Sequence, residues 1–155
     1  MTLIAVVGTA AMGGVFFAFS AFVMAALGRL PAPQAIAAMQ SINVTAVRPA
    51  FMTALFGTAA LCVWLGLRAL PHLGERRSAL MLTGALLYLL GTIALTGGYH
   101  VPLNDKLALL DPNAPASAAQ WTTYLHHWTL LNHVRTASAI GAAAAFLAAL
   151  RTPAL

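Results

Sequence analysis

Charged side chains are scarce in this sequence. The chain has eight Lys or Arg and three Asp or Glu residues among 155, which is 7% of the total, whereas ordinary globular domains carry about 25%. Hydrophobic residues make up 61%, so too few polar side chains remain to cover a water-soluble fold of this size. The scarcity excludes a soluble monomer and predicts a single domain, residues 1–155, whose natural solvent is lipid.

Cysteine is nearly absent too. The one cysteine, Cys62, lies within an apolar run and has no partner for an internal disulfide, which excludes a secreted cysteine framework. The net charge of +5 would suit a nucleic-acid-binding protein, but the basic residues are scattered between apolar runs and form no continuous basic face. We therefore expect no nucleic-acid partner.

Four apolar runs reach or approach the ~20 residues that cross a hydrocarbon core. They lie at residues 2–27, 49–67, 78–99 and 130–150. The first run has no basic region before it and is longer than the ~7–15-residue core of a cleavable signal, so we expect it to be retained. The sequence thus predicts an all-α integral membrane protein, an antiparallel four-helix bundle in contact with the lipid bilayer.

The fourth span differs from the others. Its uncharged part, residues 136–150, is only about 22 Å long at 1.5 Å per residue. The span must therefore include Asn132, His133 and Arg135 at or just inside the membrane boundary. We expect this helix to extend beyond the membrane.

The connections predict the orientation. Basic residues flank the second connection and follow the fourth span: Arg68, Arg76, Arg77 and Arg151. By the positive-inside rule this places both termini in the cytoplasm, with the chain in the inner or plasma membrane. The other two connections then face outward, the first with an interfacial helix at residues 34–47 and the second as an extramembrane loop at residues 97–120.

Polar side chains in the outer half of the spans are candidates for function, because ionisable groups are costly inside a membrane. They form three clusters along the sequence: Gln40, Asn43 and Arg48; Tyr99 and His100 through Asn104 and Asp105; and His126 and His127 through Trp128, Asn132, His133 and Arg135. The predicted topology brings all three clusters to one membrane face. We expect a small outward-facing pocket there, lined by His, Asn and Arg.

The spacing of the histidines along the chain argues against a simple metal site. His126 and His133 project about 20° apart on a helix, but they lie two turns apart, about 10.5 Å, and cannot chelate one ion as an i, i+4 pair does. We expect His126 and His127 to face solvent. A metal or haem would need ligands from different helices, with His100 and His133 as the candidate pair.

Four short motifs follow one another along nearly the whole chain. They are Phe19-Ser20-x-Phe22-Val23-Met24, Ala38-Met39-Gln40-x-Ile42-Asn43, Val101-Pro102-Leu103-Asn104-Asp105, and Trp128 through Asn132-His133-Val134-Arg135-Thr136. In these motifs the chain resembles the anthrone oxygenase-like group of small four-span membrane proteins. The resemblance implies oxygenation of polycyclic phenolic anthrones to anthraquinones with dioxygen. One departure is His100, at a position that is more usually asparagine in this group, which argues against a family-wide metal ligand there.

These residues suggest a mechanism without a cofactor. His133 is the expected base for the acidic C–H of a lipophilic substrate, and the resulting enolate would react with dioxygen. Arg135 or Arg48, with an asparagine, would stabilise the developing oxyanion. The asparagine candidates are Asn43, Asn104 and Asn132, and the further expected binding residues are Gln40, Tyr99, Trp128 and His100.

Two other classes of function stay open at this point. The first is a haem- or copper-dependent membrane oxidoreductase, with Arg48 or Arg135 pairing with haem propionates. The second is a non-enzymatic small transporter or an accessory membrane subunit. Glu75, Asp105 and Asp111 all fall in expected loops, which argues against a proton-coupled transporter. A homo-oligomer is compatible with each of these functions.

Overall fold

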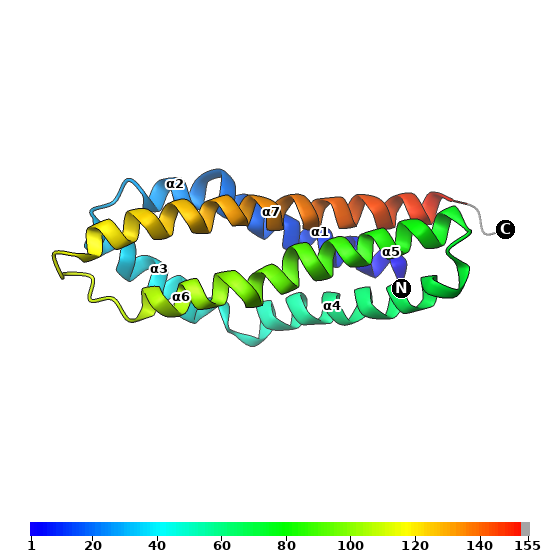
Figure 1. Ribbon diagram of the computed structural model, residues 1–155, viewed down its shortest axis with the longest axis horizontal. Helices are drawn as coiled ribbons and strands as arrows, with labels where there is room; N and C mark the ends of the chain where they lie inside the picture. Colours follow the sequence, from blue (N-terminus) through cyan, green and yellow to red (C-terminus); the bar gives the residue numbers. More distant parts are fainter. Residues whose placement is uncertain (153–155) are drawn as a thin grey trace.

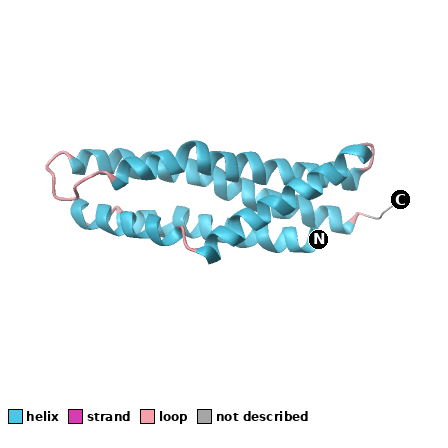
Figure 2. Cartoon of the chain, turned by 90° about the horizontal axis from the view of Figure 1, so that it is seen from below, coloured by secondary structure: helices cyan, strands magenta, loops and turns pink. Residues whose placement is uncertain are grey.

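The computed structural model describes residues 1–152 as an elongated bundle of helices (Figure 1), with no strand in that range (Figure 2). The α-helices are α1 (Thr2–Ala18), α2 (Met24–Leu27), α3 (Ala32–Ala46), α4 (Pro49–Ala69), α5 (Arg76–Tyr88), α6 (Val101–Ala108) and α7 (Ser117–Arg151). π-helical turns at Phe19–Val23, Leu89–Ala94 and Thr96–His100 join α1 to α2 and α5 to α6, and a 3₁₀ turn, Leu70–His72, follows α4.

These elements combine into four long helical rods. The rods Thr2–Leu27, Pro49–His72, Arg76–Ala108 and Ser117–Arg151 are each long and apolar enough to cross a membrane. α7 packs against α1 and α5, while α4 lies between α1 and α5 on the opposite side. The chain is a multi-pass membrane protein, and the predicted all-α four-helix bundle is confirmed.

Proline accounts for the break between α3 and α4. Arg48 precedes Pro49, and its backbone is extended (ψ 151°) because the residue before a proline disfavours the α conformation. Pro49 then occupies the first turn of α4, where its missing N–H leaves no hydrogen bond unmade. The break between α3 and α4 therefore lies at Val47 and Arg48, part of the way along the bundle (Figure 1).

The helix predicted at residues 34–47 is present as α3 (Ala32–Ala46), and it packs against other helices of the bundle. α3 runs along the long axis of the bundle rather than across it (Figure 1). Its buried residues Ala35, Ile36 and Met39 pack in one apolar cluster with Leu107 of α6 and Trp121 of α7. The parts of α6 and α7 beside α3 offer an apolar face, and α3 buries its own apolar residues against them.

The predicted outer loop at residues 97–120 is also mostly wrong. The third rod continues as a helix to Ala108 and α7 begins at Ser117, so only residues 109–116 lie outside helices. Gln40 of α3 stabilises this end, because its Nε2 donates to the carbonyl oxygens of Leu107 (2.9 Å) and Leu110 (3.0 Å). α7, with 35 residues, is about 52 Å long, and it extends well past a ~30 Å hydrocarbon core.

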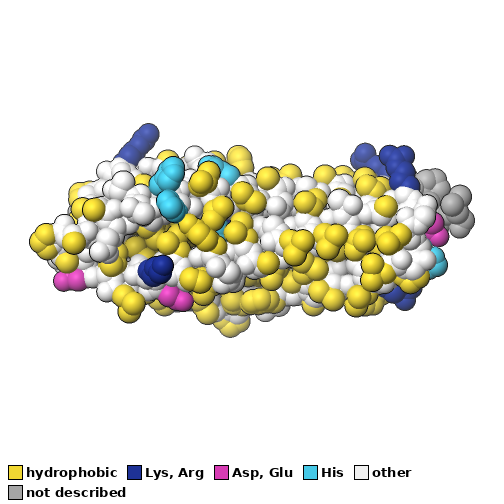
Figure 3. Space-filling model, in the orientation of Figure 1, with side chains coloured by type: hydrophobic (Ala, Val, Ile, Leu, Met, Phe, Trp, Pro, Cys, Tyr) yellow, Lys and Arg dark blue, Asp and Glu magenta, His cyan; other side chains and the backbone are white. Residues whose placement is uncertain are grey.

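The distribution of charge agrees with a membrane-spanning bundle. On the face shown in Figure 3, Lys and Arg side chains lie toward the two ends, and hydrophobic side chains dominate the band between them. The N-terminus lies near the end of the bundle that carries the α4–α5 connection (Figure 1). We call this the inner end, and the end with α3, α6 and residues 109–116 the outer end.

The close contact between Gly91 and α7 leads to a prediction about the stability of the bundle. A Cβ at position 91 would overlap the side chain of Ser138, so Gly91→Ala should lower the free energy of unfolding by about 1–3 kcal/mol. Thermal unfolding in detergent measures this as a lower midpoint. Gly57→Ala is the matched control, because its added Cβ has no described atom within 4 Å beyond its chain neighbours and the backbone of its own helical turns. Adding Ser138→Gly to Gly91→Ala should restore the midpoint, and no recovery would contradict the overlap.

Candidate functional site

A cavity of about 430 Å³ opens in the outer half of the bundle, and we call it the Arg135 cavity. Its walls come from α1, α3, the start of α4, the third rod and α7. Most of its lining is apolar or aromatic, including Phe16, Phe19, Phe51 and Trp128. The volume lies within the roughly 300–1,000 Å³ typical of small-molecule sites. Val47 also lines it, so the cavity reaches the break between α3 and α4.

Besides Ser41 and Thr45 of α3, five polar side chains line this mostly apolar cavity. They are Asn43 from α3, Thr96 and His100 from the π-helical turn of the third rod, Asn104 from α6 and Arg135 from α7. Two of them belong to a π-helical turn, a departure from α-helix that is frequent at functional sites. The predicted convergence of the three sequence clusters at one place is therefore confirmed for His100, Asn104, Asn43, Trp128 and Arg135.

Arg135 is buried, with only 5% of its surface exposed. Its Nη1 donates to Thr96 Oγ1 (3.3 Å) and its Nη2 to Asn132 Oδ1 (2.8 Å), while its Nε has no hydrogen-bond partner in the described chain. The guanidinium carbon lies 4.6 Å from the ring centroid of Phe16 and 5.0 Å from that of Trp128. These ring faces attract a cation, but they do not neutralise it.

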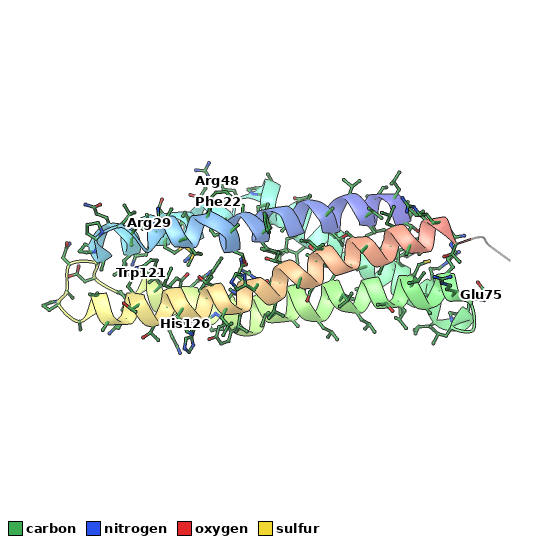
Figure 4. The ribbon with its side chains drawn as sticks, turned by 90° about the horizontal axis from the view of Figure 1, so that it is seen from above. Phe22, Arg29, Arg48, Glu75, Trp121 and His126 are labelled. Carbon is green, nitrogen blue, oxygen red and sulfur yellow. The ribbon has the colours of Figure 1, made fainter. Side chains whose placement is uncertain are left out.

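No carboxylate balances this cation. Across residues 1–152 the one ion pair is His72 with Glu75 (3.6 Å), at the inner end (Figure 4). Asp105 and Asp111 are exposed, and neither is among the residues that line the cavity. The Arg135 cavity is therefore a positively charged site inside an apolar bundle, and it favours a ligand that carries or develops negative charge.

Asn132 holds Arg135 in place. It is fully buried, and its Nδ2 donates to the carbonyl oxygen of Phe16 (2.7 Å) and to Ser20 Oγ (2.8 Å). Its Oδ1 accepts from Arg135, so its amide is fully engaged and it does not line the cavity. Asn132 was predicted to line the pocket, but its amide is instead engaged with Phe16, Ser20 and Arg135, where it orients the guanidinium.

His100 is the one cavity-lining side chain that can accept a proton. It is 1% exposed, and its ring packs edge-on against Trp128 with the centroids 5.2 Å apart. Nε2 lies 3.3 Å from the carbonyl oxygen of Trp128, and Nδ1 lies 3.4 Å from that of Leu95. A neutral imidazole donates to only one of these acceptors, whereas a protonated ring donates to both. The two carbonyls therefore fix the orientation of the ring in the cavity wall.

Two asparagines add hydrogen-bonding groups to the cavity. Asn104 Oδ1 accepts from Tyr124 Oη (2.8 Å) and Trp128 Nε1 (3.1 Å), which orients its amide. Asn43 Nδ2 is buried and has no partner within the described residues. Its N–H groups are available to an acceptor on a ligand.

His133 does not reach the cavity, so its predicted role as the base is wrong. It is exposed and is not among the lining residues. Trp128, Asn132 and Arg135 lie on the buried face of α7, at the i, i+4, i+7 spacing of one helix face. His133 follows Asn132 by one residue, or about 100°, and points outward. The structure therefore does not bring His133 and His100 together as metal ligands, and within residues 1–152 no three His, Cys, Asp or Glu side chains group as a metal site.

Three other predicted binding residues lie elsewhere. Arg48 is exposed and points away from the bundle (Figure 4), because the extended backbone before Pro49 turns it outward. Gln40 is used at the α6 terminus, as described above. Tyr99 lines a separate hollow between α6 and α7, where its Oη lies 3.1 Å from His127 Nδ1. His126 and His127 are exposed as expected, and Figure 4 shows His126 pointing outward.

The sequence reasoning did not assign several residues of the site, and four of them matter to the geometry described above. They are Phe16, Phe19, Thr96 and Tyr124. Tyr124 carries a sequence signal, since it precedes Trp128 by four residues and so shares its helix face. The other three lie in apolar runs, where nothing in the local pattern separates a cavity wall from ordinary packing.

Comparison with known proteins agrees with the resemblance seen in the motifs. A family model described as anthrone oxygenase matches residues 43–145, which is more than half of the chain and includes Asn43, His100, Asn104 and Arg135. No curated protein and no solved structure matches the chain. The chain belongs to the anthrone oxygenase family.

Proposed function

We propose that this protein is a membrane-embedded oxygenase that oxidises an anthrone-like polycyclic phenol, or a similar lipophilic substrate, with dioxygen. The observation that carries the proposal is the buried Arg135, which faces an apolar, aromatic cavity without a carboxylate partner. Such a cation stabilises an oxyanion strongly, because the surrounding dielectric is low and the charge is already in place. The family supports the same class of reaction.

The first step is removal of a proton from carbon. In an anthrone this carbon lies between two aromatic rings, and the electrons left behind delocalise onto the ketone oxygen as an enolate. We assign this proton to His100 as general base, because its imidazole is the basic ring that lines the cavity within the described chain. Arg135 and the free amide of Asn43 stabilise the enolate oxygen.

Oxygen then reacts with the electron-rich carbon. One electron passes from the enolate to dioxygen, and the two radicals combine to form a C–O bond and, after protonation, a hydroperoxide. Loss of the second C–H proton breaks the O–O bond and releases water. The balance is CH₂ + O₂ → C=O + H₂O, so one oxygen atom enters the product and the substrate supplies all four electrons. This sequence uses no further reductant and no cofactor.

We also propose the orientation of the bundle in the membrane. Arg68, Arg76, Arg77 and Arg151 belong to the inner end, and the positive-inside rule assigns such an end to the cytoplasm. The Arg135 cavity then lies toward the outer leaflet of the cell membrane, where a lipophilic substrate and dioxygen both partition.

Oxygen transfer is tested with purified protein in lipid nanodiscs and 1,8-dihydroxyanthrone. We expect faster formation of the quinone, one O₂ consumed per quinone, and one ¹⁸O atom per quinone when ¹⁸O₂ is supplied. Empty nanodiscs measure spontaneous oxidation and are the control. A quinone yield no faster than in empty nanodiscs would contradict the proposed activity for this class of substrate.

A further inference from the structure

The charge of Arg135 calls for an anion even when no reaction takes place. Arg135 is nearly fully buried in a bundle that spans a membrane, and a buried cation is unfavourable unless an anion or a full set of hydrogen bonds compensates it. Its protein partners, Thr96 and Asn132, are neutral, and its Nε has no hydrogen-bond partner among the described residues. The compensation inside the protein is therefore incomplete.

One negative charge would be enough to neutralise the Arg135 cavity. Among the residues that line the cavity, all within the described chain, Arg135 is the single Lys or Arg and no Asp or Glu is present. A monoanion would bring the cavity to neutrality, whereas a phosphate dianion would leave an excess negative charge in an apolar site. The balance favours a carboxylate or a phenolate.

A second donor supports an anionic oxygen at this place. Asn43 Nδ2, on α3, is buried without a partner in the described residues and lines the same cavity as Arg135. Two unpaired N–H donors from separate helices thus lie around one apolar space. The remaining walls, including Phe16, Phe19 and Trp128, suit a flat hydrocarbon body and not a hydrated ion.

We infer that the Arg135 cavity is a binding site for lipophilic monoanions, which it holds in ionised form with the anionic oxygen beside Arg135 and Asn43. The inference deepens the proposed function, on which it rests for the aromatic class of ligand. It adds that a substrate with an acidic phenol is bound as its phenolate before any carbon is deprotonated. Other lipophilic monoanions then compete for the same cavity.

Binding is tested with 9-anthracenecarboxylate and its methyl ester, which share one aromatic body and differ by one charge. Neither has the acidic C–H that the proposed reaction needs, so turnover plays no part. We expect the wild-type protein in zwitterionic nanodiscs to bind the carboxylate at least about tenfold more tightly, relative to partition into empty nanodiscs. Equal affinities for acid and ester would overturn the inference, whatever the outcome of the oxygenation experiment.

Variants test whether Arg135 causes the preference for the carboxylate over its ester. Arg135→Gln should lower carboxylate affinity by roughly 30-fold or more and leave ester affinity near the wild-type value. Arg135→Lys keeps the charge and should keep a preference for the acid. Arg48→Gln is the matched control, because Arg48 is an exposed cation outside the cavity, and it should bind both probes as the wild type does. If Arg48→Gln loses the preference and Arg135→Gln keeps it, the site is elsewhere.

Folding and the source of the anion need separate measurements. Circular dichroism and gel filtration in detergent show whether Arg135→Gln is folded, and the wild-type comparison of acid and ester does not depend on any variant. Palmitate should displace the bound carboxylate, and its methyl ester should not, if the site accepts monoanions of lipid origin as well as aromatic ones. Displacement by chloride alone, with none by palmitate, would overturn the assignment to lipophilic ligands.

Discussion

Arg135→Gln is expected to lower kcat/KM for anthrone oxidation by about 100- to 1,000-fold, the loss typical of removing one oxyanion donor. Glutamine keeps hydrogen-bonding groups at this position but carries no charge. The enolate oxygen would then form in an apolar cavity whose lining holds no other cation in the described chain. Quinone formation in nanodiscs, corrected for spontaneous oxidation, measures the effect.

Two variants serve as controls for this loss. Arg135→Lys restores the charge without the planar guanidinium and should recover part of the activity. His133→Ala changes a residue two positions away that is exposed and lies outside the cavity, and it should turn over at close to the wild-type rate. Full activity in Arg135→Gln, or inactivation by His133→Ala instead, would show that the oxyanion is stabilised elsewhere.

His100→Asn should reduce kcat by about 10²- to 10⁴-fold near neutral pH, the usual contribution of a general base, although asparagine is more usual at this position in the group, because in this chain His100 is the basic side chain that lines the cavity within the described residues. Asparagine retains polar atoms near the carbonyl oxygens of Leu95 and Trp128 but does not accept a proton. Raising the pH should recover activity in the variant, because hydroxide then removes the proton that His100 no longer takes. The pH dependence of kcat for wild type and variant measures both effects.

His127→Ala is the matched control for His100. Its ring is exposed and its Nδ1 lies near Tyr99 Oη, outside the Arg135 cavity, so we expect no loss of turnover. A His100→Asn variant as active as the wild type at neutral pH would mean that Arg135 alone makes the substrate acidic enough to ionise. If the kcat of His100→Asn does not recover at high pH, His100 contributes to packing and not to proton removal.

The spans could be predicted because they follow from hydropathy. Each apolar run is long enough to satisfy its own backbone hydrogen bonds inside lipid, so the helices need no tertiary information. The convergence of His100, Asn104 and Arg135 was also predictable, since antiparallel spans bring alternate connections to one membrane face. Asn43 entered the same cluster because it directly precedes the second span.

The failures arise where side-chain direction decides the outcome. His133 and Arg135 are two residues apart, and hydropathy does not tell which of them faces the bundle. Packing decides which of them does. Asn132 hydrogen-bonds to α1, and in this orientation of α7 Arg135 enters the cavity and His133 faces outward. The apolar residues of α3 were visible in the sequence, but their packing partner was not; the partner is the face of α6 and α7 beside it.

The scarcity of charge has two consequences for this protein. The first follows from the sequence alone, and the second follows from the tertiary structure. Composition was enough to require lipid as solvent and four helices as the fold, because burial of apolar surface and of backbone polar groups depends little on which residue contacts which. The isolation of Arg135 depends on contacts. Only the folded bundle leaves Glu75, Asp105 and Asp111 outside the cavity and places a buried cation among Phe16, Trp128 and Asn43, since close approach of side chains from separate helices is a property of packing.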